Sequence, residues 1–186
     1  EIRSAASPGN GITVISDKQT NKFLGIWDQY LSGNVSILKF VPASGAASRM
    51  FKDLFEFIDG ESLTPAKPAE IQFFKEIEKF AFFNALNEKC VANEAKSIPE
   101  LMAADEYKKI VENLLLPKGL NYGALPKGLL LFHSYADAKR TPMQEHLVEG
   151  ALYAANSAGE VNIHFTVSGE HRALFEAHLQ ESVDKF

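Results

Sequence analysis

A loop of small residues, Pro42 to Arg49, has the residue types that bind a phosphate anion. Small side chains let main-chain N–H groups approach phosphate oxygens, and the two serine hydroxyls are further donors. The expected phosphate- or nucleotide-binding residues are Ala43, Ser44, Gly45, Ala46, Ala47 and Ser48. Arg49 can hold a phosphate through two parallel hydrogen bonds. The loop is neither a P-loop nor a Rossmann glycine motif. A tight strand-to-helix turn with Arg49 on the surface fits the same residues.

The elements around this loop are those that an anion site needs. Residues 35–41 form a β-branched and aromatic run, which predicts a buried strand. After Arg49 the apolar residues recur at helical spacing until Gly60, which predicts a helix. The loop would therefore lie at a helix N-terminus, where the partial positive charge favours an anion.

The second half of the chain alternates strands and helices. Residues 129–133 and 161–167 read as strands, and Ser168-Gly169 begins a last helix. Between the strands, Thr141 and Pro142 begin a helix, with Gln144 completing a capping box. Such alternation predicts a mostly parallel sheet flanked by helices on both faces. Ligands of these sheets bind beyond the carboxyl ends of the strands, which is where Pro42 to Ser48 would lie.

Residues 51–124 interrupt this alternation as a helical insertion. Pro68 opens one helix, and Ser97 with Glu100 forms a capping-box pattern that begins a helical region ending near Leu116. We expect a single α/β domain over residues 1–186, with the insertion as an interaction surface in one hypothesis. The chain begins with Glu1 rather than Met and ends inside a helical pattern, so we expect a piece of a longer protein.

Composition narrows the function classes. The 186 residues include 19 Lys+Arg and 24 Asp+Glu, a net charge of −5, which disfavours broad binding to nucleic acid or anionic membranes. No apolar run is long enough to span a bilayer. Cys90 is the only cysteine, which excludes an internal disulfide and fits a cytoplasmic location.

Several other side chains have both a functional and a structural interpretation. His133 and Arg140 could each add an accessory contact to the ligand. Alternatively, His133 is a packed or surface histidine at the end of a strand, and Arg140 lies in a solvated turn. Tyr122 would stack on a base or anchor its loop. Glu145, His146 and Glu149, and also His171 and His178, have the residue types of metal ligands. His171 and His178 are seven residues apart, which is not the i, i+4 zinc spacing, and we expect no protein-bound metal at either place. Cys90, within the insertion, is expected in the core.

The loop 43–50 together with residues 125–131 resembles the nucleotide-sugar pyrophosphorylases, nucleotidyltransferases of the GT-A type. Their first strand leads into Gly-x-Gly-Thr-Arg-Met/Leu, and a Pro-Lys-x-Leu segment follows. Gly45, Ser48, Arg49 and Met50 match the first motif, although Ala47 replaces its second glycine. Pro126 and Lys127 match the second motif, and residues 141–147 match a later helix. Segments 40–52, 125–135, 140–154 and 164–171 also resemble domain-of-unknown-function family 4301.

The nucleotidyltransferase resemblance implies that a sugar 1-phosphate attacks the α-phosphate of a nucleoside triphosphate and that pyrophosphate leaves. Arg49 and Lys127 would be the catalytic residues. Arg49 would hold the pyrophosphate, and Lys127 would bind the α-phosphate or the sugar phosphate. Mg²⁺ would bridge the phosphates, but no residue matches the family's metal-binding Asp, which implies a partner segment elsewhere in the same polypeptide. A non-catalytic nucleotide- or phosphate-binding module is the alternative.

Overall fold

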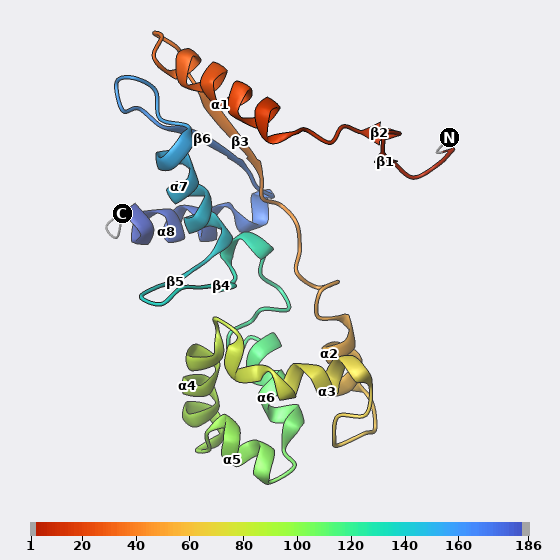
Figure 1. The fold of residues 1–186 in the computed structure, drawn as a ribbon. Coiled ribbons are helices and arrows are strands. Elements are labelled where there is room, and N and C mark those ends of the chain that lie inside the picture. Colours follow the sequence, from red (N-terminus) through yellow and green to blue (C-terminus); the bar gives the residue numbers. More distant parts are fainter. Residues whose placement is uncertain (1–2, 184–186) are drawn as a thin grey trace. The chain divides into compact units, whose positions relative to one another are not determined.

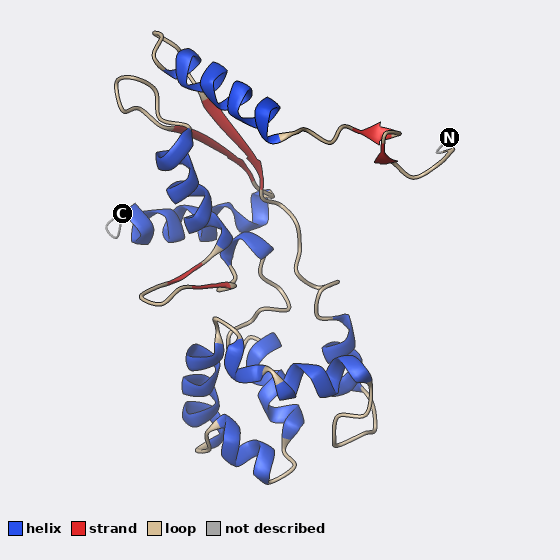
Figure 2. Ribbon diagram, in the orientation of Figure 1, coloured by secondary structure: helices blue, strands red, loops and turns tan. Residues whose placement is uncertain are grey.

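The computed structural model describes residues 3–183, which form two compact units (Figure 1). The first unit contains the described residues up to Lys39 together with Gly150–Asn162. The second contains Phe40–Glu149 and the described residues from Ile163 onward. The chain is mixed α/β, as its sequence predicts, with helices predominating over short strands (Figure 2).

The first unit contains a short parallel strand pair and one long helix. The strands are β1 (Ser7–Pro8) and β2 (Gly11–Ile12), and the helix is α1 (Asp17–Leu31). Ser16 begins α1 through a capping box with Gln19. The helix begins at Asp17, before its first apolar side chain, Phe23, because the cap and not the apolar residues defines its first turn.

The strand pair that precedes the first loop lies mainly in the second unit. Strands β3 (Leu38–Pro42) and β6 (Asn162–Thr166) pair with each other. The Phe40 ring stacks on His164, and the Ala43 N–H donates to the carbonyl oxygen of Thr166 at 2.9 Å. Residue numbers rise together along both strands, so the strands run parallel. This pairing confirms a strand in two of the three predicted ranges. The first was expected to be buried, but Leu38 and Phe40 are exposed and only Val41 is buried, because the strand pairs with β6 alone instead of lying inside a broad sheet.

The prediction of a strand over residues 129–133 is wrong. The segment begins in a 3₁₀ turn, η2 (Lys127–Leu129), and only its last residue enters a strand, β4 (His133–Ser134), which pairs antiparallel with β5 (Lys139–Arg140). Leu130 is fully buried in the helical core. The apolar run thus reflects burial against helices, a case that periodicity cannot distinguish from a buried strand. The sheets consequently have two strands each rather than forming one broad parallel sheet.

Residues 51–124 are mostly helical, as predicted (Figure 1). The core of this helical region also includes Ala47 and Leu130, which lie outside these bounds. A break at Asp105, whose φ is +57°, divides the helical stretch predicted after Ser97 into two helices. Ser97 caps the first of them by the expected box with Glu100. The elements of this region are α2 (Lys52–Asp59), α3 (Pro68–Lys75), η1 (Ile77–Lys79), α4 (Phe83–Glu94), α5 (Ile98–Ala103) and α6 (Tyr107–Leu115).

Two helices complete the chain, and both were predicted. Helix α7 (Pro142–Tyr153) begins with the expected capping box, in which the Thr141 N–H donates to Gln144 Oε1 at 3.0 Å and the Gln144 N–H donates to Thr141 Oγ1 at 3.3 Å. A 3₁₀ turn, η3 (Gly169–His171), leads into α8 (Arg172–Val183).

Candidate functional site

The two sequence-predicted loops meet in the second unit. The Lys127 N–H donates to the carbonyl oxygen of Gly45 at 3.0 Å, and Ala46 and Pro126 form an isolated antiparallel bridge. Main-chain contacts therefore join segments that are distant along the chain. The contact fixes the position of Lys127 relative to the small-residue loop.

A cavity of about 180 Å³, the phosphate cavity hereafter, lies where these loops meet. Among residues 3–183, Lys127 and His146 are the basic residues that line it, and no Asp or Glu does. The remaining lining residues come from the first loop, from Gly128, from the start of α7, from β6 and from α8: Val41, Pro42, Ala43, Gly45, Gly128, Pro142, Met143, Phe165 and Phe175.

The polar groups at this cavity are suited to an anion. Within residues 3–183, the Lys127 ammonium has no ion pair and no side-chain hydrogen bond. In the same part of the chain, the N–H groups of Ser44, Gly45 and Ala46 donate to no protein acceptor. These three residues are exposed. Gly45 lines the cavity, whereas Ser44 and Ala46 flank it in the chain and do not line it. Open amides and an ammonium ion together provide donors and positive charge for phosphate oxygens.

The start of α7 adds to this electrostatic environment. Pro142, its first residue, and Met143 line the cavity. The first N–H groups of a helix have no intrahelical acceptor and carry partial positive charge. Thr141 Oγ1 satisfies the Gln144 N–H, which holds the helix end in place. The sequence identified this cap, but not that the helix would begin at the same cavity as the small-residue loop.

His146 was considered from the sequence as a metal ligand and as part of the helix that matches the nucleotidyltransferases, but not as a residue of this cavity. It lies one turn after Pro142, lines the cavity and contacts Glu149 through Nδ1 at 3.0 Å from Oε2. The carboxylate fixes the orientation of the imidazole ring. The i, i+4 spacing from Pro142 is the signal that places His146 on the same helix face.

The two glycines of the cavity serve different purposes. A Cβ on Gly45 would meet no protein atom within 4 Å, whereas one on Gly128 would lie 3.0 Å from Cζ of Phe175. Gly128 is thus required by packing against α8. The space beside Gly45 is open, so a side chain there would compete with a ligand and not with the protein.

The last three residues of the predicted first loop, Ala47 to Arg49, do not line the phosphate cavity. Ala47 is fully buried in the core of the helical region, so it is a packing residue. Ser48 and Arg49 are exposed in the turn before α2, and neither lines the phosphate cavity. Within residues 3–183, the Arg49 guanidinium has no ion pair. The structure therefore brings Lys127 and the 43–46 segment together but leaves Arg49 outside the cavity.

The two accessory candidates lie in the β4–β5 hairpin. His133 pairs with Arg140 in the strand register, and neither lines the phosphate cavity. Arg140 contacts Glu145 at 3.4 Å, and its guanidinium lies 4.7 Å from the centre of the Tyr135 ring. It lines a different cavity, of about 610 Å³, with Thr141 and His178.

The structure also settles the roles of Tyr122 and Cys90. Tyr122 is buried, and its hydroxyl accepts a hydrogen bond from the Leu131 N–H at 3.1 Å, so it anchors its loop. Cys90 is fully buried, and burial followed by the nearby Glu94 raises its pKa to about 11. A thiol with so high a pKa is a core residue and not a nucleophile, as predicted.

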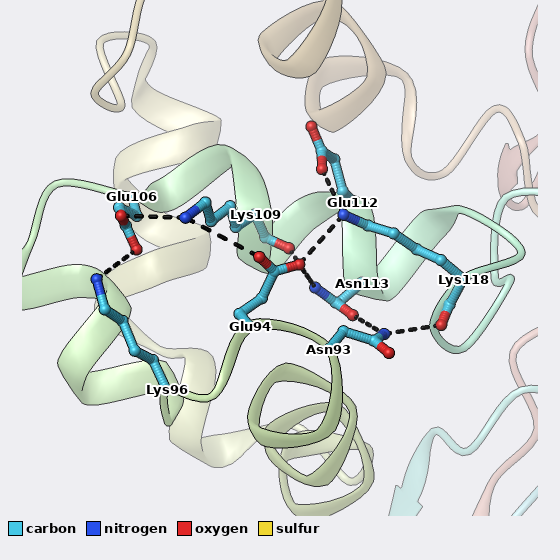
Figure 3. Close-up of polar contacts among 8 residues, drawn as sticks. All are labelled: Asn93, Glu94, Lys96, Glu106, Lys109, Glu112, Asn113 and Lys118. Atoms are coloured by element: carbon cyan, nitrogen blue, oxygen red, sulfur yellow. Dashed lines mark hydrogen bonds and ion pairs between the residues drawn. The ribbon is translucent and has the colours of Figure 1, made fainter.

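A charged network joins α4 and α6 with the segments next to them (Figure 3). Buried Asn113 on α6 donates to Glu94 Oε1 at 3.1 Å and accepts from Asn93 Nδ2 at 2.6 Å. Lys118 joins Glu94 at 3.2 Å and Glu112 at 2.7 Å. Burial opposes ionisation of Glu94, but hydrogen bonds from Asn113 and Lys118 outweigh it and lower its pKa. Each charge here has a partner, so the network is structural.

Metal chemistry receives no support from protein ligands. Among the described residues, no three His, Cys, Asp or Glu side chains gather so as to hold a metal ion. The donors at the phosphate cavity also do not fit Mg²⁺, which prefers carboxylate oxygens. As for membranes, no helix in residues 3–183 combines the length and apolar character needed to cross a bilayer.

Taken together, the fold and the site define a mixed α/β protein with a cationic cavity between two loops. A family model described as Domain of unknown function (DUF4301) matches residues 1–186, so the chain belongs to this family. No curated protein and no solved structure matches the chain.

Proposed function

We propose that this protein binds the phosphate groups of a nucleoside triphosphate in the phosphate cavity. One observation carries the proposal: the hydrogen bond from the Lys127 N–H to Gly45 joins the two loops around one cavity. Lys127, the open amides of Ser44 to Ala46 and the start of α7 are the groups that would hold the phosphates.

The reaction proposed for the complete protein is nucleotidyl transfer in a GT-A type fold. A sugar 1-phosphate attacks the α-phosphate, the bond to the β-phosphate breaks, and pyrophosphate leaves. Lys127 would stabilise charge on the reacting phosphate, and Arg49 would meet the pyrophosphate outside the cavity. No step is assigned to Mg²⁺, because no carboxylate lines the cavity. A reaction that consumes nucleoside triphosphates implies a cytoplasmic protein.

The second candidate is a non-catalytic nucleotide- or phosphate-binding module. The same lack of a carboxylate at the cavity favours it, since the lining side chains include no general base other than His146. Both candidates require phosphate binding. Only the first requires release of pyrophosphate in the presence of a sugar 1-phosphate.

Calorimetric titration of the full-length protein with nucleoside triphosphates tests the site. Lys127→Ala should weaken binding by about tenfold or more, because a charge-assisted hydrogen bond contributes roughly 1.5–3 kcal/mol. Arg49→Ala should have the smaller effect on affinity. Lys89→Ala, which removes an exposed cation from α4, is the matched control and should leave affinity unchanged. Equal affinity of wild type and both site variants would reject the assignment. A pyrophosphate-release assay then separates the two candidates.

A further inference from the structure

A second cavity, the aromatic cavity hereafter, lies in the helical region. Its volume is about 410 Å³, within the roughly 300–1,000 Å³ typical of small-molecule sites. Five of its lining residues are phenylalanines, and the single charged one is Asp53: Met50, Phe51, Asp53, Leu54, Ala69, Phe73, Phe80, Phe82 and Phe132. The phosphate cavity, at about 180 Å³, is below the typical range and suits phosphate groups alone.

The aromatic cavity presents flat faces and one acceptor. The rings of Phe73 and Phe80 stack with their centres 5.4 Å apart. The rings of Phe80 and Phe82 are nearly parallel, with centres 5.0 Å apart and an angle of 6° between their planes. Phe73 and Phe80 are only partly buried, so they remain accessible to a ligand. Asp53 is exposed and, within residues 3–183, forms no ion pair. A planar ring with N–H donors on one edge matches this lining.

Both loops of the phosphate cavity continue into the aromatic cavity. Gly45 lines the first and Met50 the second, while Lys127 lines the first and Phe132 the second. Each pair is five residues apart, so each link spans at most about 18 Å even if fully extended. Arg49 lies next to Met50 on the first link. A ligand with an anionic end and a planar end would thus find both sites along the same two segments.

We infer that the aromatic cavity binds the base of the nucleotide whose phosphates occupy the phosphate cavity, and that Asp53 selects guanine. The inference rests on the proposed function. A carboxylate is an acceptor only and can take two parallel hydrogen bonds, which match the adjacent N1–H and N2–H donors of guanine. Uracil offers one N–H between two carbonyl oxygens, which repel a carboxylate. Adenine and cytosine place an amino group beside an acceptor nitrogen.

The first experiment compares guanosine, adenosine and uridine triphosphates with inorganic tripolyphosphate, by calorimetry on the full-length protein. Guanosine triphosphate should bind about tenfold more tightly than the uridine nucleotide and than tripolyphosphate. Asp53→Asn should remove the difference between bases without changing tripolyphosphate binding. The matched control is Asp59→Asn, which neutralises an exposed carboxylate in the last turn of α2 and should change nothing.

A second experiment tests the aromatic faces. Phe73→Leu keeps an apolar side chain but removes one stacking surface, so it should weaken binding of every nucleotide several-fold while tripolyphosphate binding stays constant. Phe83→Leu is the control, because Phe83 packs against the same core without lining the cavity. Far-UV circular dichroism and a thermal melt verify that both variants fold.

The outcomes separate the two proposals. Tripolyphosphate that does not bind, or that binds equally to Lys127→Ala, would overturn the phosphate site itself. If tripolyphosphate binds through Lys127 but as tightly as guanosine triphosphate, and neither Asp53→Asn nor Phe73→Leu alters nucleotide affinity, the phosphate site stands and the base site is wrong.

Discussion

The helical region and the loops at the phosphate cavity satisfy their polar groups in opposite ways. In the helical region, the buried amide of Asn113 is paired on both its oxygen and its nitrogen, and Glu94 has three cationic or amide partners. In the loops, the amides from Ser44 to Ala46 and the Lys127 ammonium have no protein partner among residues 3–183.

This difference separates groups that stabilise the fold from groups that remain available to a ligand. A buried polar group without a partner costs free energy, so packing and pairing go together in the helical region. Exposed donors are hydrated at little cost and can exchange water for phosphate oxygens. We therefore expect substitutions in the core and charged network of the helical region to affect stability, and substitutions in the loops of the phosphate cavity to affect binding.

The largest expected effect is on the core of the helical region. Leu114 on α6 is fully buried, and Leu114→Ala should lower the free energy of unfolding by about 2–5 kcal/mol through lost burial and a new cavity. Urea unfolding followed by circular dichroism measures the change. Val91→Ala, at a half-exposed position on α4, is the control and should cost far less. Similar losses for both variants would contradict the assigned core.

The next effect concerns the charged network. Asn113→Ala removes the donor to Glu94 and the acceptor for Asn93, and should cost roughly 1–3 kcal/mol of unfolding free energy. Phosphate affinity of the remaining folded protein should be unchanged. A variant that lost affinity while keeping its stability would mean that the network serves the ligand site and does not only stabilise the fold.

A pH dependence follows from Glu94. Its pKa is lowered in the folded protein, so its contribution to stability is present above the unfolded pKa near 4.5 and is lost as the pH falls through the folded value. We expect Glu94→Gln to be less stable than wild type by on the order of 1 kcal/mol at pH 7, with a smaller difference at pH 3. Unfolding curves at the two pH values check this, and a difference that grows on acidification would have the wrong sign.

The smallest stability effect is expected in the first loop. Gly45→Ala places a Cβ where no protein atom lies within 4 Å, so the unfolding free energy should change by less than about 1 kcal/mol. Triphosphate affinity should nevertheless fall, because the methyl group enters the phosphate cavity. Gly128→Ala makes the opposite comparison: its Cβ would crowd the Phe175 ring and lower stability. Unaltered affinity in Gly45→Ala would show that the ligand does not approach this loop.

Local signals in the sequence located most elements and one half of the candidate site. The strand runs before Pro42 and after Gly159, the capping boxes at Ser97 and Thr141, and the burial of Cys90 were all predicted and are confirmed. These features depend on neighbouring residues and on apolar spacing, which the sequence carries directly.

Two predictions failed or stayed incomplete because they depend on which distant segments a residue contacts in the folded protein. The apolar run at Leu129 to His133 packs Leu130 into a helical core, although its composition is typical of a strand. Arg49 was expected in the phosphate site, but it is exposed and does not line the cavity, whereas His146 does. Neither distinction can be read from one segment alone.

The sequence by itself determined the α/β class, the helical character of residues 51–124 and the presence of a small-residue loop and a Pro-Lys segment. Only the tertiary structure decided that these two segments share one cavity with the start of α7. The reason is physical: caps and periodicity are set by residues a few positions apart, while a cavity is formed by long-range contacts such as Lys127 to Gly45.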